Sequence, residues 1–290
     1  MKRAISSFIV LPLLLIGFGS LQGATLLDDA VAYWDFEGNL DGTHSINLTD
    51  VSGTTAGMTP TVVPTFNPVS GIKAVNAGTQ AVAFDGSNVL KTNAASLRIG
   101  GAQTLWLRVN LGSIPSGTVA FMTRSRPVNS QRGISLQMTN GHLQGYLSAD
   151  GTTYNTQLTN SSSYALQASS WYDISMRFDP SNVLRIDLYD PVTGTLLDSM
   201  ETTANVPASI STSNSIGSGY FQVGSINNGS SGSAYIVPDG TLIESAAVWN
   251  SYLSDADVRS LSAVPEPRSI SMLMMGGASL AMILRMSRCR

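Results

Sequence analysis

Cysteine, histidine and charged side chains are all scarce in this sequence of 290 residues. Cys289, near the end of the chain, is the only cysteine, so the body of the chain forms no internal disulfide. His44 and His142 are the only histidines and fall on separate predicted loops, which argues against a zinc hydrolase. The domain must therefore depend on its packed core or on another metal ion.

Charged residues make up 12% of the chain. Long helices carry charged residues on their surfaces, whereas this chain is rich in Gly, Ser, Thr and Asn, which suit turns and exposed strand faces. Without the six basic residues and one acidic residue at its two ends, the chain keeps 10 basic and 18 acidic side chains, a net charge of −8. Nucleic acid needs clustered Lys and Arg, so we exclude it as a partner.

The N-terminus predicts a secretory signal peptide over residues 1–24. Lys2 and Arg3 supply the positive start, Phe8–Phe18 is an apolar run, and a small residue follows at Ala24. We therefore expect this protein to be exported from the cytoplasm.

Three features follow one another at the other end, over residues 264–290. They are the run Val264-Pro265-Glu266-Pro267, the apolar stretch Ile270–Leu284, and the basic residues Arg285, Arg288 and Arg290. Fifteen apolar residues are short for a membrane span, for which about 20 are usual, but flanking arginines extend the reach of such a stretch. A basic cluster directly after a span stops it in the membrane and stays on the cytoplasmic side.

This tail resembles the PEP-CTERM sorting signal of Gram-negative bacteria. The resemblance implies that an exosortase-type membrane protease recognises Pro265, Glu266 and Pro267 and removes the tail. The protein would be held in the membrane before processing and would then reach the cell envelope, the cell surface or the extracellular matrix. An ordinary C-terminal anchor is the alternative, and both place the domain outside the cytoplasm.

Residues 25–263 predict one all-β domain. In Trp171–Asp179, apolar and polar residues alternate with the period of a strand, and turn residues such as Asn140-Gly141 separate runs of this kind. The other predicted strands are Val31–Phe36, Ala81–Phe84, Thr104–Val109, Val119–Thr123, Gly133–Thr139, Leu143–Leu147, Val183–Asp190, Phe221–Ile226 and Leu242–Trp249. Residues 43–79 and 205–233 are predicted loops, and Ser254 is the predicted cap of a short helix. The pattern predicts a sandwich or barrel.

Several runs, in their order, resemble the LamG-like, concanavalin A-like jelly-roll family. They are Ala32–Gly38, Ala81–Ser87, Leu105–Arg108, Ser170–Ile174, Leu184–Tyr189, and Ile243–Ser254 with the following helix Asp255–Leu261. The resemblance implies a two-sheet antiparallel jelly-roll sandwich. The paired acids that close the family's last strand are Glu244-Ser245 here, so one carboxylate of that pair is missing.

Calcium is the candidate cofactor. Asp35, Glu37, Asp85 and Glu244 can supply the oxygen ligands that calcium prefers, and calcium is common in the family that the chain resembles. Glu244 falls on the predicted inward face of its strand, where a carboxylate needs a cation or hydrogen-bond donors. Backbone amides or an arginine are the alternative partners.

Catalysis on this scaffold would need two carboxylates about 5–5.5 Å apart in a retaining glycoside hydrolase. The sandwich fold that the resemblance implies also hosts laminarinase-type glycoside hydrolases, whose motif is Glu-x-Asp-x-x-Glu, and none of the four glutamates here belongs to such a cluster. Asp35 and Glu37 share a predicted strand face, which we interpret as a strand end that meets a polar loop.

Binding through aromatic side chains is the remaining possibility. Core packing is the role predicted for most of the tryptophans, Trp34, Trp106, Trp171 and Trp249, because they fall in or beside strands that form the core. Five tyrosines in or near predicted loops are candidates for a binding surface: Tyr146, Tyr154, Tyr164, Tyr220 and Tyr235. We therefore predict a non-catalytic module for adhesion, or for binding extracellular polysaccharide or a surface protein. A polysaccharide hydrolase or lyase and a passive surface-layer protein are the alternatives.

Overall fold

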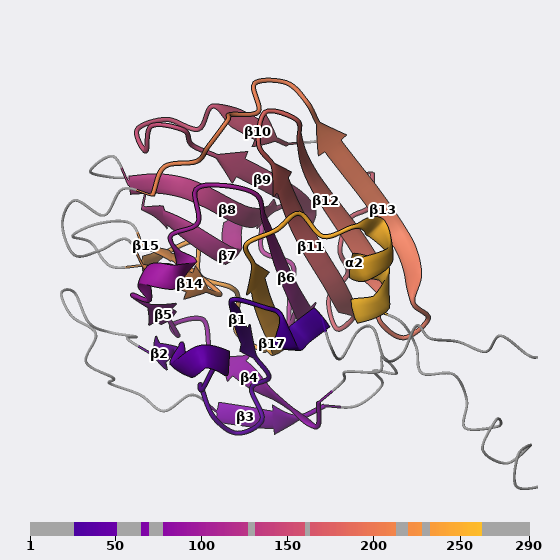
Figure 1. The fold of residues 1–290 in the computed structure, drawn as a ribbon. Coiled ribbons are helices and arrows are strands. Elements are labelled where there is room, and N and C mark those ends of the chain that lie inside the picture. Colours follow the sequence, from indigo (N-terminus) through magenta and orange to yellow (C-terminus); the bar gives the residue numbers. More distant parts are fainter. Residues whose placement is uncertain are drawn as a thin grey trace, which may run out of the picture.

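The computed structural model describes residues 26–50, 65–69, 78–126, 131–159, 163–212, 220–227 and 233–262. They form two antiparallel sheets, called sheet A and sheet B here, that pack face to face with a few short helices at the surface (Figure 1). This architecture confirms the predicted all-β sandwich. The predicted signal peptide and the sorting tail lie outside the described residues. None of the helices within the described ranges is long and apolar enough to cross a membrane.

Sheet A has the strand order β13-β12-β11-β6-β17-β4-β3, and β1 pairs with β17 beside this path. Its long central strands are the ones with the clearest alternation in the sequence. The strands of sheet A are β1 (Ala32–Trp34), β3 (Thr65–Pro68), β4 (Gln80–Phe84), β6 (Gln103–Asn110), β11 (Trp171–Asp179), β12 (Val183–Asp190), β13 (Thr195–Thr202) and β17 (Thr241–Trp249).

Sheet B has the order β10-β9-β8-β7-β14-β5-β2. The hairpin between β8 and β9 is closed by Asn140-Gly141, whose φ angles of 52° and 83° are those that a two-residue turn requires. The strands of sheet B are β2 (Thr49–Asp50), β5 (Leu90–Thr92), β7 (Thr118–Arg126), β8 (Gln131–Thr139), β9 (His142–Leu147), β10 (Thr156–Leu158) and β14 (Phe221–Val223). Other short elements are the ladder of β15 (Ile226–Asn227) and β16 (Ser233–Ala234), and the 3-10 helices Thr43–Ser45 and Ala95–Leu97.

The predicted loops are only partly loops. Short strands β2, β3, β15 and β16 lie in the described parts of 43–79 and 205–233. The predicted strand Phe221–Ile226 ends at Val223, because Gly224 has a φ of 76° that directs the chain out of sheet B. These strands are two to four residues long, too short for a period to be recognised in the sequence.

The main core lies between the two sheets. Alternate residues of each long strand enter it, as Tyr172, Ile174 and Met176 of β11 do. A second apolar cluster lies on the outer face of sheet A, the face turned away from sheet B, and includes Trp106 and Trp249. The helix α2 (Asp255–Leu261), which confirms the predicted helix, covers this cluster and is seen beside β11 and β12 in Figure 1.

A buried ion network fixes α2 to sheet A. Arg108 of β6 donates two hydrogen bonds to Asp173 of β11, at 2.7 and 2.8 Å, and one to the carbonyl of Leu261 at the end of α2. Arg177 binds Asp187 and, at 2.7 Å, Asp255 in the first turn of α2. The helix is therefore held at both ends.

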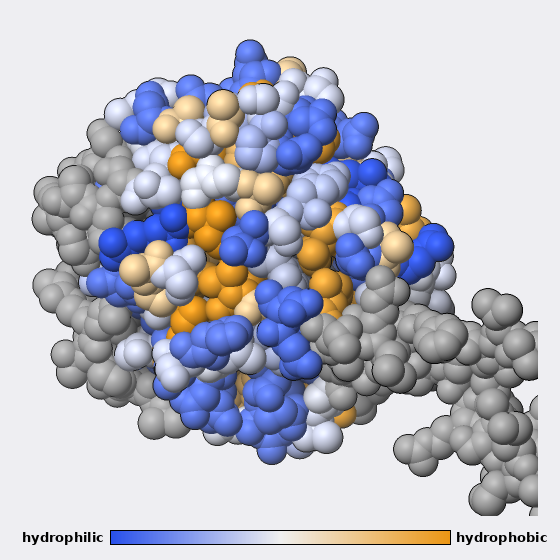
Figure 2. Space-filling model, viewed as in Figure 1, coloured by the Kyte–Doolittle hydropathy of each residue, from blue (hydrophilic) through white to orange (hydrophobic). Residues whose placement is uncertain are grey.

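The surface is mixed in character. In the view of Figure 2, hydrophobic residues gather towards the middle and hydrophilic residues lie above and below them. Among the described side chains, Leu196 and Tyr235 are the large hydrophobic ones that are clearly exposed, at 39% and 45%. The hydrophobic area in the middle of this view is therefore formed mainly by partly exposed side chains.

Candidate functional site

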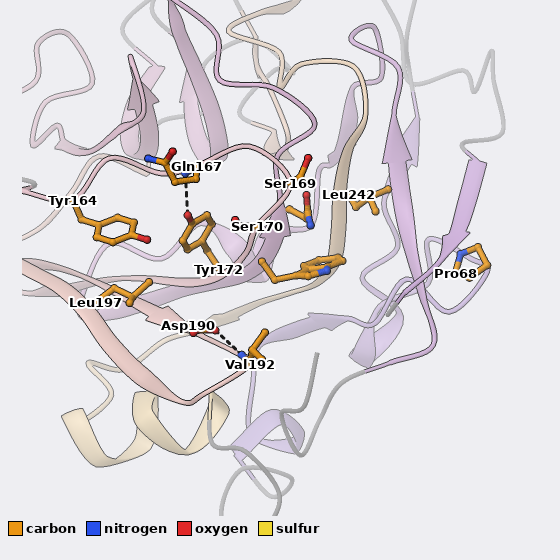
Figure 3. A pocket seen from close by; sticks show the side chains of 12 residues that line it. Pro68, Tyr164, Gln167, Ser169, Ser170, Tyr172, Asp190, Val192, Leu197 and Leu242 are labelled. Carbon is orange, nitrogen blue, oxygen red and sulfur yellow. Dashed lines mark hydrogen bonds between the residues drawn. The ribbon is translucent and has the colours of Figure 1, made fainter. Parts of the chain in front are cut away.

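A groove of about 660 Å³ lies at the rim of sheet A, where β6 ends and β11 and β17 begin (Figure 3). Asn110, Trp171 and Leu242 are neighbours there, because Asn110 pairs across the sheet with both of the others. The groove is lined by Pro68, Asn110, Tyr164, Gln167, Ser169, Ser170, Trp171, Tyr172, Asp190, Val192, Leu197 and Leu242.

Aromatic rings form much of the groove wall. Trp171 is half-buried, unlike the next residue, Tyr172, which turns into the core because side chains alternate along a strand. The ring of Tyr164 meets that of Tyr172 edge to face, with 6.1 Å between the ring centres. In Figure 3 these two tyrosines lie on the same side of the groove as Leu197.

The loop that carries Tyr164 and Gln167 is fixed in place. Five of its described backbone N–H groups donate hydrogen bonds to surrounding elements. These bonds join Ser163 N (3.0 Å) and Tyr164 N (3.1 Å) to Asp198 Oδ2, Leu166 N to Gly141 O (2.9 Å), Gln167 N to Tyr172 Oη (2.9 Å) and Ser169 N to Leu111 O (2.7 Å). A ligand that enters the groove therefore meets a wall that is already ordered, which lowers the entropy cost of binding.

Several polar groups in the groove are available to a ligand. Within the described ranges, the Asn110 amide, the Ser170 hydroxyl and the Trp171 indole N–H make no side-chain hydrogen bond. A hydrogen bond with Tyr172 and, second, burial raise the pKa of Tyr164 to about 12, so that its hydroxyl stays protonated at neutral pH. The groove thus offers donors and acceptors beside ring faces.

Asp190 is the single carboxylate among the described residues that line the groove. Both of its oxygens are engaged within its own turn, because Oδ1 accepts from Val192 N at 2.7 Å and Oδ2 from Thr193 Oγ1 at 2.8 Å. The arrangement supplies one hydrogen-bonded acid rather than a pair of facing acids.

Of the four calcium candidates, Glu37 and Glu244 lie together around Gly78. A Cβ on Gly78 would lie 2.8 Å from Glu244 Oε1 and closer still to Glu37 Oε1. Glu37 accepts hydrogen bonds from Thr79 N at 2.6 Å and Gln80 N at 2.9 Å. Burial raises the pKa of Glu37, but a hydrogen bond from the Thr79 hydroxyl at 2.6 Å, together with these two backbone bonds, outweighs burial and holds the pKa below its ordinary value. Glu37 therefore anchors the start of β4.

Glu244 does not follow the inward face predicted for it. A β-bulge between Ile243 and Ser245 makes Glu244 an extra residue, so its carboxylate joins Arg108 on the outer face at 3.4 Å. The backbone N–H of Gly78 and the hydroxyl of Ser245 also donate to it. Burial raises the pKa of Glu244, and Arg108 partly offsets this. Its partners are the amide and arginine that the sequence left as alternatives.

Asp35 Oδ1 accepts a hydrogen bond from the backbone N–H of Glu37 at 3.3 Å, whereas Asp85 is engaged in its own turn. Asp35 does not share a strand face with Glu37, because β1 ends at Trp34 and Phe36 has a φ of 50°. Asp85 accepts a hydrogen bond from the backbone N–H of Ser87 in its own turn. It lies five residues beyond Gln80, which bonds Glu37, and at about 3.3 Å per residue this separates Asp85 from the two glutamates. Across the described residues, no three Asp, Glu, His or Cys side chains converge as a metal site needs. Calcium stays a prediction, checked by whether it raises the melting temperature.

The candidate tyrosines fall in different places. Tyr164 lines the groove, whereas Tyr146 and Tyr154 lie together on sheet B with ring centres 5.0 Å apart. Tyr235 is exposed, and the ring of Tyr220 lies 4.5 Å from the Lys91 ammonium group. The structure thus brings one of the five to the groove.

Solved structures with the same fold are known. Domain 4 of AbnA, a GH43 extracellular arabinanase from Geobacillus stearothermophilus solved in complex with arabinotriose, matches with a TM-score of 0.55 and 11% identity over 81% of this chain and 98% of that one. The binding domain of botulinum neurotoxin serotype G matches with a TM-score of 0.52 and 10% identity, and this chain covers 50% of its length. The chain folds as a jelly-roll β-sandwich. No protein-family model matches the sequence, and no curated protein matches it.

The jelly-roll sandwich buries three tryptophans as predicted, but not Trp171. Trp34, Trp106 and Trp249 are each at most 1% exposed, whereas Trp171 lines the groove. The sequence does carry a signal for the position of Trp171. The alternation in Trp171–Asp179 places Trp171 on the same strand face as Asp173, opposite the apolar residues. Asn110 and Leu242 carry no such signal, since only the pairing of β6 with its neighbours brings them to the groove.

Proposed function

We propose that this protein is a non-catalytic binding module that takes an extracellular carbohydrate into the groove beside Trp171. The observation that carries the proposal is the half-buried Trp171 next to the free amide of Asn110, on a rim whose loop is fixed by hydrogen bonds. Ring faces pack against the C–H face of a sugar, while amides and hydroxyls bond its hydroxyl groups. A concave site with a few placed polar groups suits such a ligand.

The absence of a second acid favours binding over hydrolysis. A glycoside hydrolase needs two carboxylates flanking the bond that it cleaves. Asp190 is alone among the described groove residues, and both of its oxygens are occupied by its turn. Domain 4 of AbnA shares this fold and was solved in complex with arabinotriose, which also supports carbohydrate binding as the proposed function.

The predicted signal peptide and sorting tail support a location for this module outside the cytoplasm. The LamG-like motifs and the PEP-CTERM-like tail support an exported protein that an exosortase-type protease delivers to the cell surface or the extracellular matrix of a Gram-negative bacterium. An extracellular polysaccharide, or a glycan on a surface protein, is the partner that this location supplies.

A glycan array that includes arabinotriose, followed by calorimetric titration of the best ligand, tests the proposal. We expect Trp171→Ala to weaken binding at least tenfold, which corresponds to about 1.4 kcal/mol. Tyr235→Ala is the matched control, because Tyr235 is exposed away from the groove lining, and it should bind like the wild type.

Two outcomes would overturn the proposal. Release of reducing sugar from a bound ligand, lost in Asp190→Asn, would establish the hydrolase alternative. An array without any bound glycan, with and without calcium, would leave the passive surface-layer protein.

A further inference from the structure

Two arginines lie together where the ends of the two sheets are bridged. Residues 210 and 211 form the bridge, because Ile210 N bonds the carbonyl of Gly100 and Ser211 N that of Ser148, at 2.9 and 2.8 Å. Arg124 of β7 donates to the carbonyl of Ser211. Arg98 precedes Gly100 by two residues and is close enough to act on the charge of Arg124.

The Arg124 guanidinium occupies space that a glycine leaves open. A Cβ on Gly133 would lie 2.8 Å from Arg124 Nη2 and 3.1 Å from its Cζ. Arg124 is 4% exposed, whereas Arg98 is partly exposed. The sandwich therefore holds one buried cation near a second cation that is partly exposed.

Among the described residues, no carboxylate forms an ion pair with either of these arginines. The ion pairs among the described residues belong to Arg108, Arg177 and Arg185. The internal segments outside the described ranges contain no Asp or Glu, so they cannot supply a partner. Burial and the nearby charge of Arg98 lower the pKa of Arg124 to about 10, which still leaves it protonated at neutral pH. An isolated buried charge is costly unless a counter-charge is bound.

Both arginines also keep an unused donor. The Nε–H groups of Arg98 and Arg124 are buried and, within the described part of the chain, meet no hydrogen-bond acceptor. Arg98 uses one other donor, Nη2, on Asn93 Oδ1 at 3.0 Å. Buried donors without acceptors are rare in native proteins, and guanidinium groups bind oxyanions through paired N–H bonds.

We propose that Arg98 and Arg124 form an anion-binding site that takes a carboxylate or sulfate group of an acidic polysaccharide. The site is separate from the groove, because β6 runs between them with eight residues, roughly 26 Å. In a domain with a net charge of −8, neither arginine of this pair forms an ion pair with a described acidic residue, although Arg124 is buried.

Galacturonate, neutral galactose and inorganic sulfate are the probes, with melting temperature and calorimetric titration as readouts on the purified protein at constant ionic strength. We expect galacturonate, sulfate or both to bind the wild type, and galactose not to bind at this site. Arg124→Met should abolish anion binding, and Arg98→Gln should weaken it at least tenfold. Arg132→Gln is the control, because Arg132 already donates to the carbonyl of Thr152.

The pattern of responses decides the matter. Response to galacturonate alone identifies a uronic acid carboxylate as the ligand group, and response to sulfate alone identifies a sulfate ester. Equal stabilisation of wild type and both variants would overturn the proposal, because it would reflect a general effect of the salt. Should Arg124→Met fail to fold, Arg98→Gln alone decides the outcome. Trp171→Ala should keep the anion response, which separates this site from the groove.

Discussion

Replacing Arg108 by methionine should destabilise the sandwich strongly. Arg108 is fully buried and binds Asp173 through two bonds, Glu244 at 3.4 Å and the carbonyl of Leu261. Methionine fills much of the volume but leaves two carboxylates buried without a cation. Breaking a buried ion pair in this way costs about 3–5 kcal/mol. For a domain of this size the melting temperature should fall by roughly 6–20 °C.

Urea unfolding followed by circular dichroism measures this cost. Arg185→Met is the matched control, because Arg185 is 20% exposed and its partner Asp187 keeps Arg177 as a second cation. That variant should lose about 1 kcal/mol or less. Adding Asp173→Leu and Glu244→Leu to Arg108→Met should restore much of the stability, because the buried charges are then gone. An Arg108→Met protein within 1 kcal/mol of the wild type would refute this account of the network.

Three further changes have defined outcomes in the same unfolding assay. Ser254→Ala should cost about 1 kcal/mol, because Ser254 and Asp257 cap α2 reciprocally; no change would mean that the cap is dispensable. Glu37→Gln should cost about 1 kcal/mol at neutral pH. Burial raises the pKa of Glu37, but hydrogen bonds lower it further, so the folded pKa is below 4.5. The stability that the ionised Glu37 contributes is therefore present above pH 4.5 and is lost as the pH falls through the folded pKa. A stability difference between wild type and variant that does not change with pH would contradict this. Gly224→Ala should cost about 2–4 kcal/mol, because φ is 76° and the new Cβ would lie 2.6 Å from Cζ of Phe84 and closer still to Cε1; wild-type stability would show that the ring moves aside.

Strand periodicity made most of the fold predictable. Apolar and polar residues alternate along the long strands β11, β12 and β17, which are eight or nine residues long. Asn140-Gly141 predicts the hairpin between β8 and β9, because these residues readily adopt the positive φ angles of its turn. The short strands β2, β3, β15 and β16 were missed, because two to four residues are too few to show a period; β2 also depends on a partner distant in sequence, β5.

The candidate acids show why local patterns could not place the side chains. A period of two assigned Glu244 to the core, but one extra residue at the bulge after Ile243 moved it to Arg108. Phe36 has a positive φ, which breaks the strand direction between Asp35 and Glu37, so these two acids do not share a strand face as predicted. Bulges and left-handed residues are set by packing, which no single stretch of sequence reveals.

The groove was predictable in part. Tyr164 was a candidate from the sequence, whereas Trp171 was grouped with the predicted core tryptophans although the alternation in its strand carries the signal for the outer face. Asn110 and Leu242 became neighbours of Trp171 only through the order β11-β6-β17, which sequence alone did not give.

Quenching of tryptophan fluorescence by acrylamide tests carbohydrate binding in the groove most directly. Trp171 is half-buried, while the other three tryptophans are at most 1% exposed, so Trp171 should supply most of the quenchable emission. A bound oligosaccharide should protect that emission in the wild type and have no effect on Trp171→Phe. An oligosaccharide that binds tightly while the quenching of Trp171 stays unchanged would contradict the proposed site.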